Sequence, residues 1–255
     1  MYTKFKQLHY QSRPLFLQNV WDVASAALVE ENGATAIATS SAAVAWSLGL
    51  SDKDGLSMSV QIALAEQIGA SVEVPFSMDI EDGYSADPEA VADFCEKLHS
   101  QGVVGINIED GSLSPAMLSE KIIAIRRIVG PRLFINARTD VYLRGLVPEN
   151  ERLPMAIDRA RLYAESGADC IFVPGLLDPD SFAQISRSIS LPLNAMVSPG
   201  FDVSALVDAG VKRFSTGPGT FLMCYQDLIG SALSFGEMEG LMGSRSRCSD
   251  SAKVG

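Results

Sequence analysis

Short apolar segments alternate with amphipathic segments along almost the whole chain, and this alternation limits the fold more than any other feature. The apolar segments are continuous rather than alternating with polar residues, which is typical of parallel strands buried on both faces. Eight such segments occur, at 15–20, 36–41, 72–80, 104–109, 133–139, 170–176, 191–197 and 212–217. The pattern therefore predicts an α/β fold of eight β–α units.

Helix-start signals stand between these segments. Asp87, Ser114 and Asp178 are each followed by proline, and residues of these types cap helices while proline suits the first helical position. Apolar residues then recur at helical spacing, at Val91, Phe94, Cys95 and Leu98, at Leu118, Ile122, Ile125 and Val129, and at Phe182, Ile185 and Ile189.

Eight β–α units predict a single (β/α)₈ barrel of the TIM type over residues 1–240. The alternative, a doubly wound open sheet, usually has fewer strands, and no Gly-x-Gly-x-x-Gly follows the first apolar segment. Residues 241–255 are small and polar, so we expect a disordered tail there.

Composition excludes several classes of function. The formal net charge is −11 and no basic cluster occurs, which argues against nucleic-acid binding. No apolar run approaches the roughly 18 residues of a membrane-spanning helix, and the N-terminus is too polar for a secretory signal. The four cysteines are far apart, so we expect reduced thiols in a cytoplasmic protein, with Cys95, Cys170 and Cys224 buried as small hydrophobes.

The tetrapeptide Ile-Glu-Asp-Gly ends two neighbouring strands, at 80–83 and 108–111. The carboxyl ends of barrel strands form the active-site face, so Asp79, Glu81 and Glu109 are expected to converge there. Three carboxylates together are costly unless a cation neutralises them, and oxygen ligands suit Mg²⁺ or Mn²⁺. Asp82 and Asp110 are expected to serve turns or caps.

Other strand ends carry groups that can bind an organic anion. Arg138 suits a bidentate grip on a substrate carboxylate, and Ser40 and Ser41 with nearby backbone N–H groups can hold an oxyanion. Both histidines, His9 and His99, lie away from strand ends, and no strand end carries lysine. A histidine base and Schiff-base chemistry are therefore disfavoured, whereas polarisation of a 2-oxo acid and stabilisation of an enolate are favoured.

The ordered motifs "QNVWDVASAALVEENGATAIATSSAAVAWSLGLSD", "VPFSMDIEDGYS", "GINIEDG" and "NARTD" resemble the isocitrate lyase/phosphoenolpyruvate mutase superfamily, from about residue 13 to 240. The resemblance implies a Mg²⁺-binding barrel that makes or breaks C–C or C–P bonds next to a 2-oxo acid, as a lyase or isomerase. Members often exchange their last helix between subunits, so a homodimer or homotetramer is implied.

The resemblance also implies roles for individual residues. Asp79 and Glu81 match the acidic pair around the metal, although the second residue is usually Asp. Asp52 and Glu109 match outer acidic residues that hold metal-bound waters. The residues matched to binding of the small carboxylate substrate are Ser40, Ser41, Ala42, Arg138, Asn194 and Trp21.

One departure narrows the expected reaction. The lyases of the superfamily carry a Lys-x-Cys-Gly gating loop after the fourth strand, whereas here Glu109 leads straight into a capped helix. We therefore expect oxaloacetate decarboxylase or 2-methylmalate-type lyase chemistry through a metal-bound enolate, rather than isocitrate cleavage or phosphoryl migration. The residues expected to act in catalysis are Arg138, Glu109 and Tyr84, the last as a proton donor. The alternative is a non-catalytic barrel that binds a small 2-oxo acid.

Overall fold

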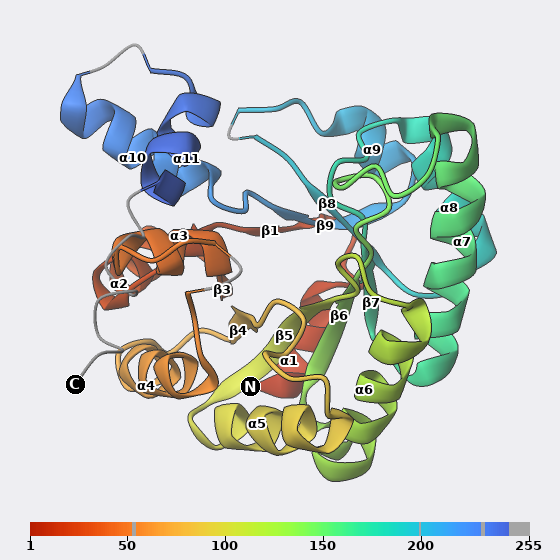
Figure 1. Cartoon of the computed structure of the whole chain (residues 1–255), viewed down its shortest axis with the longest axis horizontal. Helices are drawn as coiled ribbons and strands as arrows, with labels where there is room; N and C mark the ends of the chain where they lie inside the picture. The colour runs from red at the N-terminus through yellow and green to blue at the C-terminus, as the bar shows by residue number, and fades with distance from the viewer. Residues whose placement is uncertain (53–54, 199, 231–232, 245–255) are drawn as a thin grey trace, which may run out of the picture.

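The computed structural model describes residues 1–52, 55–198, 200–230 and 233–244, and forms a nearly closed barrel of parallel strands surrounded by helices (Figure 1). The strands are β1 (Leu15–Leu17), β2 (Asn19–Val20), β3 (Ile37–Thr39), β4 (Phe76–Asp79), β5 (Val103–Glu109), β6 (Phe134–Arg138), β7 (Cys170–Phe172), β8 (Leu193–Met196) and β9 (Val211–Ser215). Their order is β1-β9-β8-β7-β6-β5-β4-β3-β2.

The first predicted strand is divided between two neighbours. β1 pairs with β9, whereas β2 pairs with β3, and Gln18 separates the two halves. The segment 15–20 therefore joins the last strand to the second one around the barrel. The predicted (β/α)₈ barrel is confirmed, because all eight predicted apolar segments supply the wall.

Helices follow the strands in alternation. They are α1 (Tyr2–Leu8), α2 (Val23–Glu31), α3 (Ser41–Ser47), α4 (Met58–Gly69), α5 (Pro88–Ser100), α6 (Pro115–Ile128), η1 (Gly130–Arg132, a 3₁₀ turn), α7 (Glu149–Ser166), α8 (Pro179–Ser188), α9 (Ser204–Asp208), α10 (Gly219–Ile229) and α11 (Phe235–Ser244).

The predicted helix starts are confirmed. The side chains of Asp87, Ser114 and Asp178 accept hydrogen bonds from backbone N–H groups in the first turns of α5, α6 and α8, and proline follows each cap. These caps satisfy donors that the helix itself leaves unpaired. The apolar faces of α5 and α6 are buried against the barrel wall, and Gly130 follows α6 with a φ of 70°.

The N-terminal helix closes one end of the barrel. Phe5 and Leu8 of α1 are buried in a cluster with Leu15, Leu17 and inward-facing residues of β3, β5, β6 and β7. Gly105 of β5 leaves room for this plug, since a Cβ there would lie 2.7 Å from the Phe5 ring. The carboxyl ends of the strands lie at the opposite end, which is therefore where a ligand can enter.

The helices α10 and α11 stand to one side of the barrel, beside α2 and α3 (Figure 1). They are held there by a separate apolar cluster of Ala43, Phe221, Leu222 and Met238, against which Trp21 and Trp46 pack. Because α10 stands off the barrel, Cys224 is exposed, and the prediction that it is buried was wrong. Cys95 and Cys170 are buried as predicted.

The predicted tail lies almost wholly outside the described residues. The helix α11 continues to Ser244, and residues 245–255, including Cys248, are beyond the described part of the chain. Within the described ranges, none of the helices combines the length and the apolar character that crossing a membrane requires.

Candidate active site

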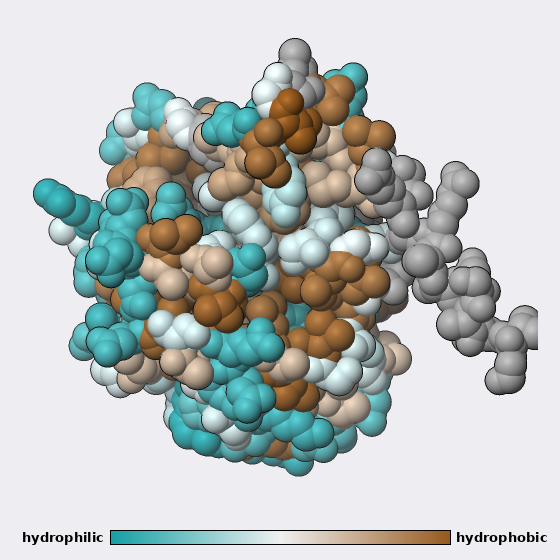
Figure 2. All heavy atoms as spheres, turned by 90° about the vertical axis from the view of Figure 1, so that its left-hand side faces the viewer, coloured by the Kyte–Doolittle hydropathy of each residue, from teal (hydrophilic) through white to brown (hydrophobic). Residues whose placement is uncertain are grey.

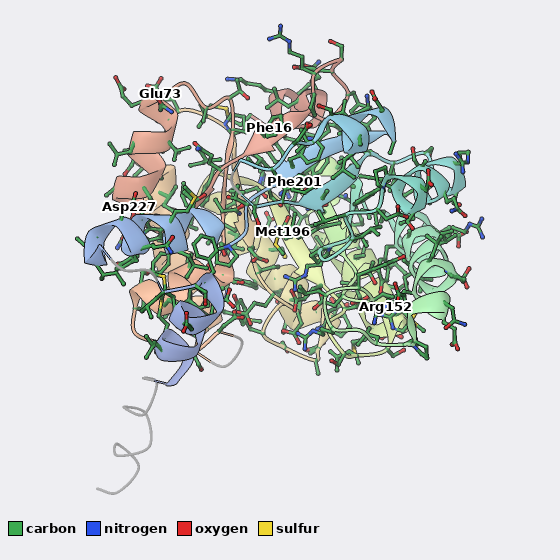
Figure 3. The ribbon with its side chains drawn as sticks, turned by 90° about the horizontal axis from the view of Figure 1, so that it is seen from above. Phe16, Glu73, Arg152, Met196, Phe201 and Asp227 are labelled. Carbon is green, nitrogen blue, oxygen red and sulfur yellow. The ribbon has the colours of Figure 1, made fainter. Side chains whose placement is uncertain are left out.

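A cavity of about 470 Å³ lies at the carboxyl ends of the strands. Met196, one of its lining residues, lies near the middle of the molecule when the structure is viewed from above (Figure 3). The predicted site residues among the lining are Ser40, Ser41, Ala42, Asp52, Asp79, Glu81, Glu109 and Arg138. The structure therefore brings together eight residues from five separate stretches of sequence.

Asp79 ends β4 and is held by the preceding strand β3 and by helix α3. Its Oδ2 accepts hydrogen bonds from the backbone N–H and the hydroxyl of Ser41, at 3.1 and 2.8 Å. Its own backbone N–H donates to Thr39 Oγ1 at 2.9 Å. These contacts fix the carboxylate, and the second oxygen, Oδ1, stays available to a ligand.

Glu81 stands in an unusual turn just after β4. Its φ is 51° and that of Tyr84 is 59°, which is uncommon for residues with a Cβ and typical of functional sites. Burial raises the pKa of the Glu81 carboxyl to about 8, and the charges of Asp79, Asp52 and Glu109 add to the effect. The site is thus poor in positive charge around Glu81.

Arg138 and Glu109 face each other across β5 and β6. They are register partners, and Arg138 Nη1 lies 2.6 Å from Glu109 Oε2. Arg138 also donates to both oxygens of Asp140, at 2.7 and 3.1 Å. Although burial disfavours a charged guanidinium, Glu109 and Asp140 raise the pKa of Arg138, so it stays a cation.

Three of the five N–H donors of Arg138 are used in these contacts, which leaves two for a ligand. Arg144, from the loop after β6, pairs with the same two carboxylates, with N···O distances of 3.3 Å to Glu109 and 2.7 Å to Asp140. Arg138 lines the cavity and Arg144 does not. The two arginines therefore share partners but line different cavities, since Arg144 borders a neighbouring one together with Glu81 and Glu109.

The glutamates of the two Ile-Glu-Asp-Gly copies have the same role, whereas the aspartates have different ones. Glu81 and Glu109 both reach the cavity, as predicted. Asp82 serves the expected turn, since it accepts from the backbone N–H of Tyr84 at 3.0 Å. Asp110 is instead fully buried, where it accepts from Arg159, Tyr163 and the backbone N–H of Asp140. It ties the end of β5 to α7 and to Asp140.

The donor set suits Mg²⁺ or Mn²⁺ by its chemistry. The acidic residues of the cavity offer only oxygen, and their mutual proximity contributes to the raised pKa of Glu81. Among the described residues, no three His, Cys, Asp or Glu side chains lie close enough to bind one ion together. Mg²⁺ commonly keeps several waters and binds through one or two carboxylates, so the residues present fit that mode.

Three predicted residues lie outside the lining of the cavity. Tyr84 sits behind Glu81 and donates to its Oε1 at 3.3 Å, and burial together with Glu81 raises the pKa of its hydroxyl. Trp21 packs edge-on against Phe221 of α10, with ring centroids 5.0 Å apart. Asn194 is fully buried inside the barrel, below the cavity. Ser40 lines the cavity and also caps α3.

Several lining residues were not predicted from the sequence. They are Asn19, Trp46, Ser51, Asn107, Leu143, Phe172, Met196, Gly217, Pro218 and Glu239. Asn107 could have been found, because it precedes Glu109 by two residues and so points to the same side of β5. Glu239 could not, because only the packing of α11 brings it to the site.

The pKa of Glu81 predicts how the stability of the metal-free protein depends on pH. Between about pH 4.5 and 8 the folded state keeps a proton that the unfolded chain loses, so the free energy of unfolding falls as pH rises. We expect a loss on the order of a few kcal/mol, since one pKa unit corresponds to about 1.4 kcal/mol. Thermal unfolding from pH 5 to 9 measures it.

Glu81→Gln should weaken this pH dependence without abolishing it, because burial also raises the pKa of Glu109, to about 7. Mg²⁺ should restore stability to the wild type near pH 8. Glu73→Gln is the matched control, because Glu73 is exposed and lies at the edge of the molecule (Figure 3). Equal pH dependence in wild type and Glu81→Gln would contradict the prediction.

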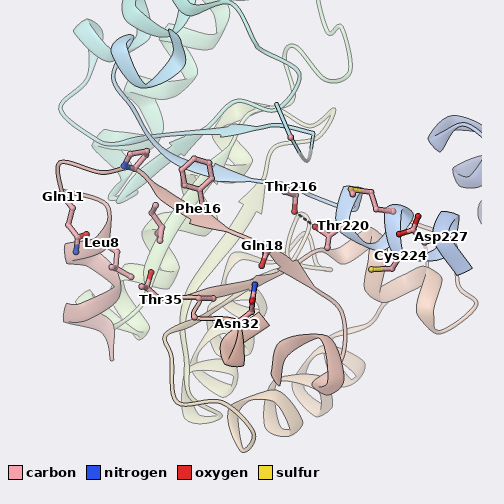
Figure 4. Close-up of a pocket in the computed structure, with 16 residues that line it drawn as sticks. Leu8, Gln11, Phe16, Gln18, Asn32, Thr35, Thr216, Thr220, Cys224 and Asp227 are labelled. Atoms are coloured by element: carbon pink, nitrogen blue, oxygen red, sulfur yellow. Dashed lines mark hydrogen bonds between the residues drawn. The ribbon is translucent and has the colours of Figure 1, made fainter. Parts of the chain in front are cut away.

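A larger cavity, of about 770 Å³, lies outside the barrel wall (Figure 4). It is bordered by Phe16 of β1, Asn32 after α2, and Thr220, Cys224 and Asp227 of α10. It lacks the cluster of acidic residues and the arginine of the smaller cavity. We therefore assign the chemistry to the smaller cavity, despite its lesser volume.

Comparison with known proteins agrees with this geometry. Residues 5–234 match the family model "Phosphoenolpyruvate phosphomutase". An uncharacterised protein of Mycobacterium tuberculosis is 40% identical over 217 residues, covering 84% of this chain and 81% of its own length. A 2-methylisocitrate lyase of Halalkalibacterium halodurans is 30% identical, covering 81% and 70%. An oxaloacetate decarboxylase of Pseudomonas fluorescens is 30% identical, covering 65% and 60%.

Solved structures share the fold. A candidate phosphonomutase of Burkholderia cenocepacia superimposes with a TM-score of 0.83 at 33% identity, covering 90% of this chain and 96% of its own. A phosphonopyruvate hydrolase in complex with oxalate and Mg²⁺ superimposes with a TM-score of 0.74, covering 95% of each chain. At 19% identity the latter likeness concerns the fold alone.

Proposed function

This chain belongs to the phosphoenolpyruvate phosphomutase family, whose relatives are lyases and mutases of small carboxylates, and from that premise we propose that it is a Mg²⁺-dependent lyase. Its proposed substrate is a small 2-oxo or 2-hydroxy dicarboxylate, in which it breaks a carbon–carbon bond. The observation that carries the proposal is the small cavity in which acidic residues face Arg138.

The charge of the cavity favours a carboxylate substrate over a phosphonate. Among the described lining residues, Arg138 is the single cation, and it already neutralises Glu109 and Asp140 in part. A phosphoryl group carries up to two negative charges and is usually held by several cations. The two free N–H donors of Arg138 suit one carboxylate instead.

The residues of the site divide into those that grip the acid and those that would hold the metal. Arg138 binds one carboxylate and so fixes the direction of the bond to be broken. Asp79, held by Ser41, and Glu81 would hold Mg²⁺, with Asp52 and Glu109 acting through water. When bound, Mg²⁺ would supply positive charge beside the 2-oxo group of the substrate.

Proton delivery is assigned to water, because Glu81 would hold the metal as a carboxylate and Tyr84 lies outside the cavity lining. The connection from β5 to α6 spans only residues 110–114, so no long loop follows Glu109 over the site. Tyr84 is connected to the cavity by Glu81, whose Oε1 accepts a hydrogen bond from the Tyr84 hydroxyl. This hydrogen bond favours the ionised form of Glu81 and so opposes the effect of burial on its pKa, which makes Tyr84 a positioning residue. The expected cytoplasmic location is also part of the proposal.

A panel of acids tests the proposed function. The assay measures the release of pyruvate or another 2-oxo acid in the presence of Mg²⁺. Its substrates are oxaloacetate and 2-methylmalate-type acids, and phosphonopyruvate is the phosphonate control. We expect turnover of at least one dicarboxylate and no phosphate release. Binding of oxalate without turnover of any acid would instead support the non-catalytic alternative.

We further propose that the protein is a homo-oligomer, with α10 and α11 at the contact. Apolar side chains gather at the top of the face in Figure 2, where these helices lie, and Leu228, Ile229 and Leu241 are 76, 51 and 51% exposed. The cavity beside α10 also leaves Phe16 of β1 55% exposed. A second copy would cover these surfaces.

Light scattering at micromolar concentration measures this directly. The expected mass is two or four times the 27.3 kDa chain, and Leu228→Lys should lower it. Leu48→Lys, on α3's C-terminal cap and also exposed, is the control that should leave the mass unchanged. A wild-type mass near 27.3 kDa would contradict the proposal.

A further inference from the structure

The layer of the barrel interior next to the cavity is polar. In barrels of this type the interior is usually filled by branched apolar residues. Below the cavity, neighbouring strands place inward-facing polar side chains that are at least 96% buried: Ser77, Asn107, Asn136, Asn194 and Arg213. Arg213 is fully buried on β9, and no described carboxylate forms an ion pair with it. A buried cation and several buried amides are costly, so a functional reason for them is expected.

Asn107 is the one member of this group that also lines the cavity. Its Oδ1 accepts two hydrogen bonds, from Arg213 Nη2 at 3.0 Å and from Asn136 Nδ2 at 2.8 Å. Arginine has only donors, so the atom that faces Arg213 must be the oxygen of the amide. The amide nitrogen therefore points away from Arg213, and no described group accepts a hydrogen bond from it.

We propose that Asn107 determines which acids bind, because its Nδ2 donates a hydrogen bond to an oxygen of the bound acid on the floor of the cavity. Arg213 and Asn136 are positioning residues that hold the amide in this orientation. An amide N–H cannot ligate a metal, so its partner is the organic ligand. This inference rests on the proposed function, since it takes the ligand to be a small carboxylate.

The amide donor of Asn107 lies beside the acidic residues of the cavity. Asp79 is the register partner of Asn107 on β4, and Asn136 is its partner on β6. Asn107 thus adds a neutral donor beside the carboxylate that would hold the metal, on the same face as Arg138. An acid without an acceptor oxygen at this point would shield the amide N–H from water without pairing it, and would therefore bind less tightly.

Asn107→Asp tests the inference with little change in shape. The new carboxylate still accepts from Arg213 and Asn136, so the protein should fold with an unchanged or higher thermal midpoint, but the donor is lost. Oxalate affinity in the presence of Mg²⁺, measured by calorimetry, should fall about tenfold or more. Affinity for Mg²⁺ alone should not fall, because no metal ligand is removed.

Asn194→Asp is the matched control. Asn194 is the register partner of Arg213 on β8, so the same change adds the same charge beside Arg213 but outside the cavity lining. It should leave oxalate affinity within about twofold of the wild type. Equal losses in both variants, or undiminished oxalate binding by Asn107→Asp, would overturn the inference.

A double substitution tests the positioning role of Arg213. Arg213→Met should weaken oxalate binding severalfold in the wild type and cause no further loss in Asn107→Ala, because it acts through the amide. The same loss in both backgrounds would assign Arg213 a general electrostatic effect instead. If the variants fail to fold, a crystal structure of the wild type with oxalate and Mg²⁺ decides, and an oxalate without contact to Asn107 Nδ2 overturns the inference.

Failure of the proposed function would look different from failure of this inference. A wild type that does not bind oxalate with Mg²⁺ refutes the carboxylate site and this inference together. A wild type that binds oxalate while Asn107→Asp binds it equally well refutes only the role of Asn107.

Discussion

Asp79→Asn is expected to abolish turnover of any acid that the wild type converts and to weaken Mg²⁺ binding at least about a hundredfold. Loss of a residue that merely supports a metal ligand costs about 10- to 100-fold, and Asp79 is assigned as a ligand itself. Asparagine keeps the shape and can still accept the two hydrogen bonds from Ser41. The fold should therefore survive, and the loss should reflect the missing charge.

Calorimetry with Mg²⁺ and a turnover assay on the same samples measure this effect. Asp82→Asn is the matched control, since Asp82 belongs to the same tetrapeptide but serves the turn before Tyr84 and lies outside the cavity lining. It should bind Mg²⁺ as the wild type does. Wild-type Mg²⁺ affinity in Asp79→Asn would remove Asp79 from the metal site.

The fold and most of the strand-end residues could be predicted because both depend on local sequence. Continuous apolar segments define parallel strands, and the residue that follows each strand must lie on one end of the barrel. Asp79, Glu81 and Arg138 were predicted for this reason. The division of the first strand at Gln18 could not be predicted, because it depends on two different neighbours, β9 and β3.

Residues whose position depends on long-range packing were the ones that prediction missed or misplaced. Trp21 follows the first strand, but the position of α10 draws its ring onto Phe221. The side chain of Asn194 faces the barrel interior, but it lies one layer below the residues that line the cavity. Glu239 reaches the cavity from the far end of the chain, and no local pattern marks it.

The same distinction explains why identical tetrapeptides came to differ. Asp82 and Asp110 occupy the same place in the two copies, and local sequence predicts a turn for each. Asp82 is partly exposed, with Lys121 nearby, whereas Asp110 meets Arg159 and Tyr163 from α7. The partner that arrives from a distant helix, rather than the tetrapeptide itself, decides the role of the aspartate.

Arg138→Lys separates a ligand-binding arginine from a structural ion pair. The structure gives Arg138 both characters, because it lines the cavity and also pairs with Glu109 and Asp140. Lysine keeps the positive charge but loses the planar fork that grips a carboxylate. A charge-assisted pair of this kind contributes roughly 1.5–3 kcal/mol, so oxalate affinity should fall about tenfold or more and turnover should fall with it.

Arg144→Lys supplies the control that the structure makes possible. Arg144 pairs with the same Glu109 and Asp140 but does not line the cavity, so its replacement disturbs the same carboxylates without removing a ligand contact. We expect a lower thermal midpoint in both variants and a large loss of oxalate affinity only in Arg138→Lys. If both variants lose stability and neither loses oxalate affinity, Arg138 is a structural partner of Asp140, and the carboxylate grip must be assigned to other residues of the cavity.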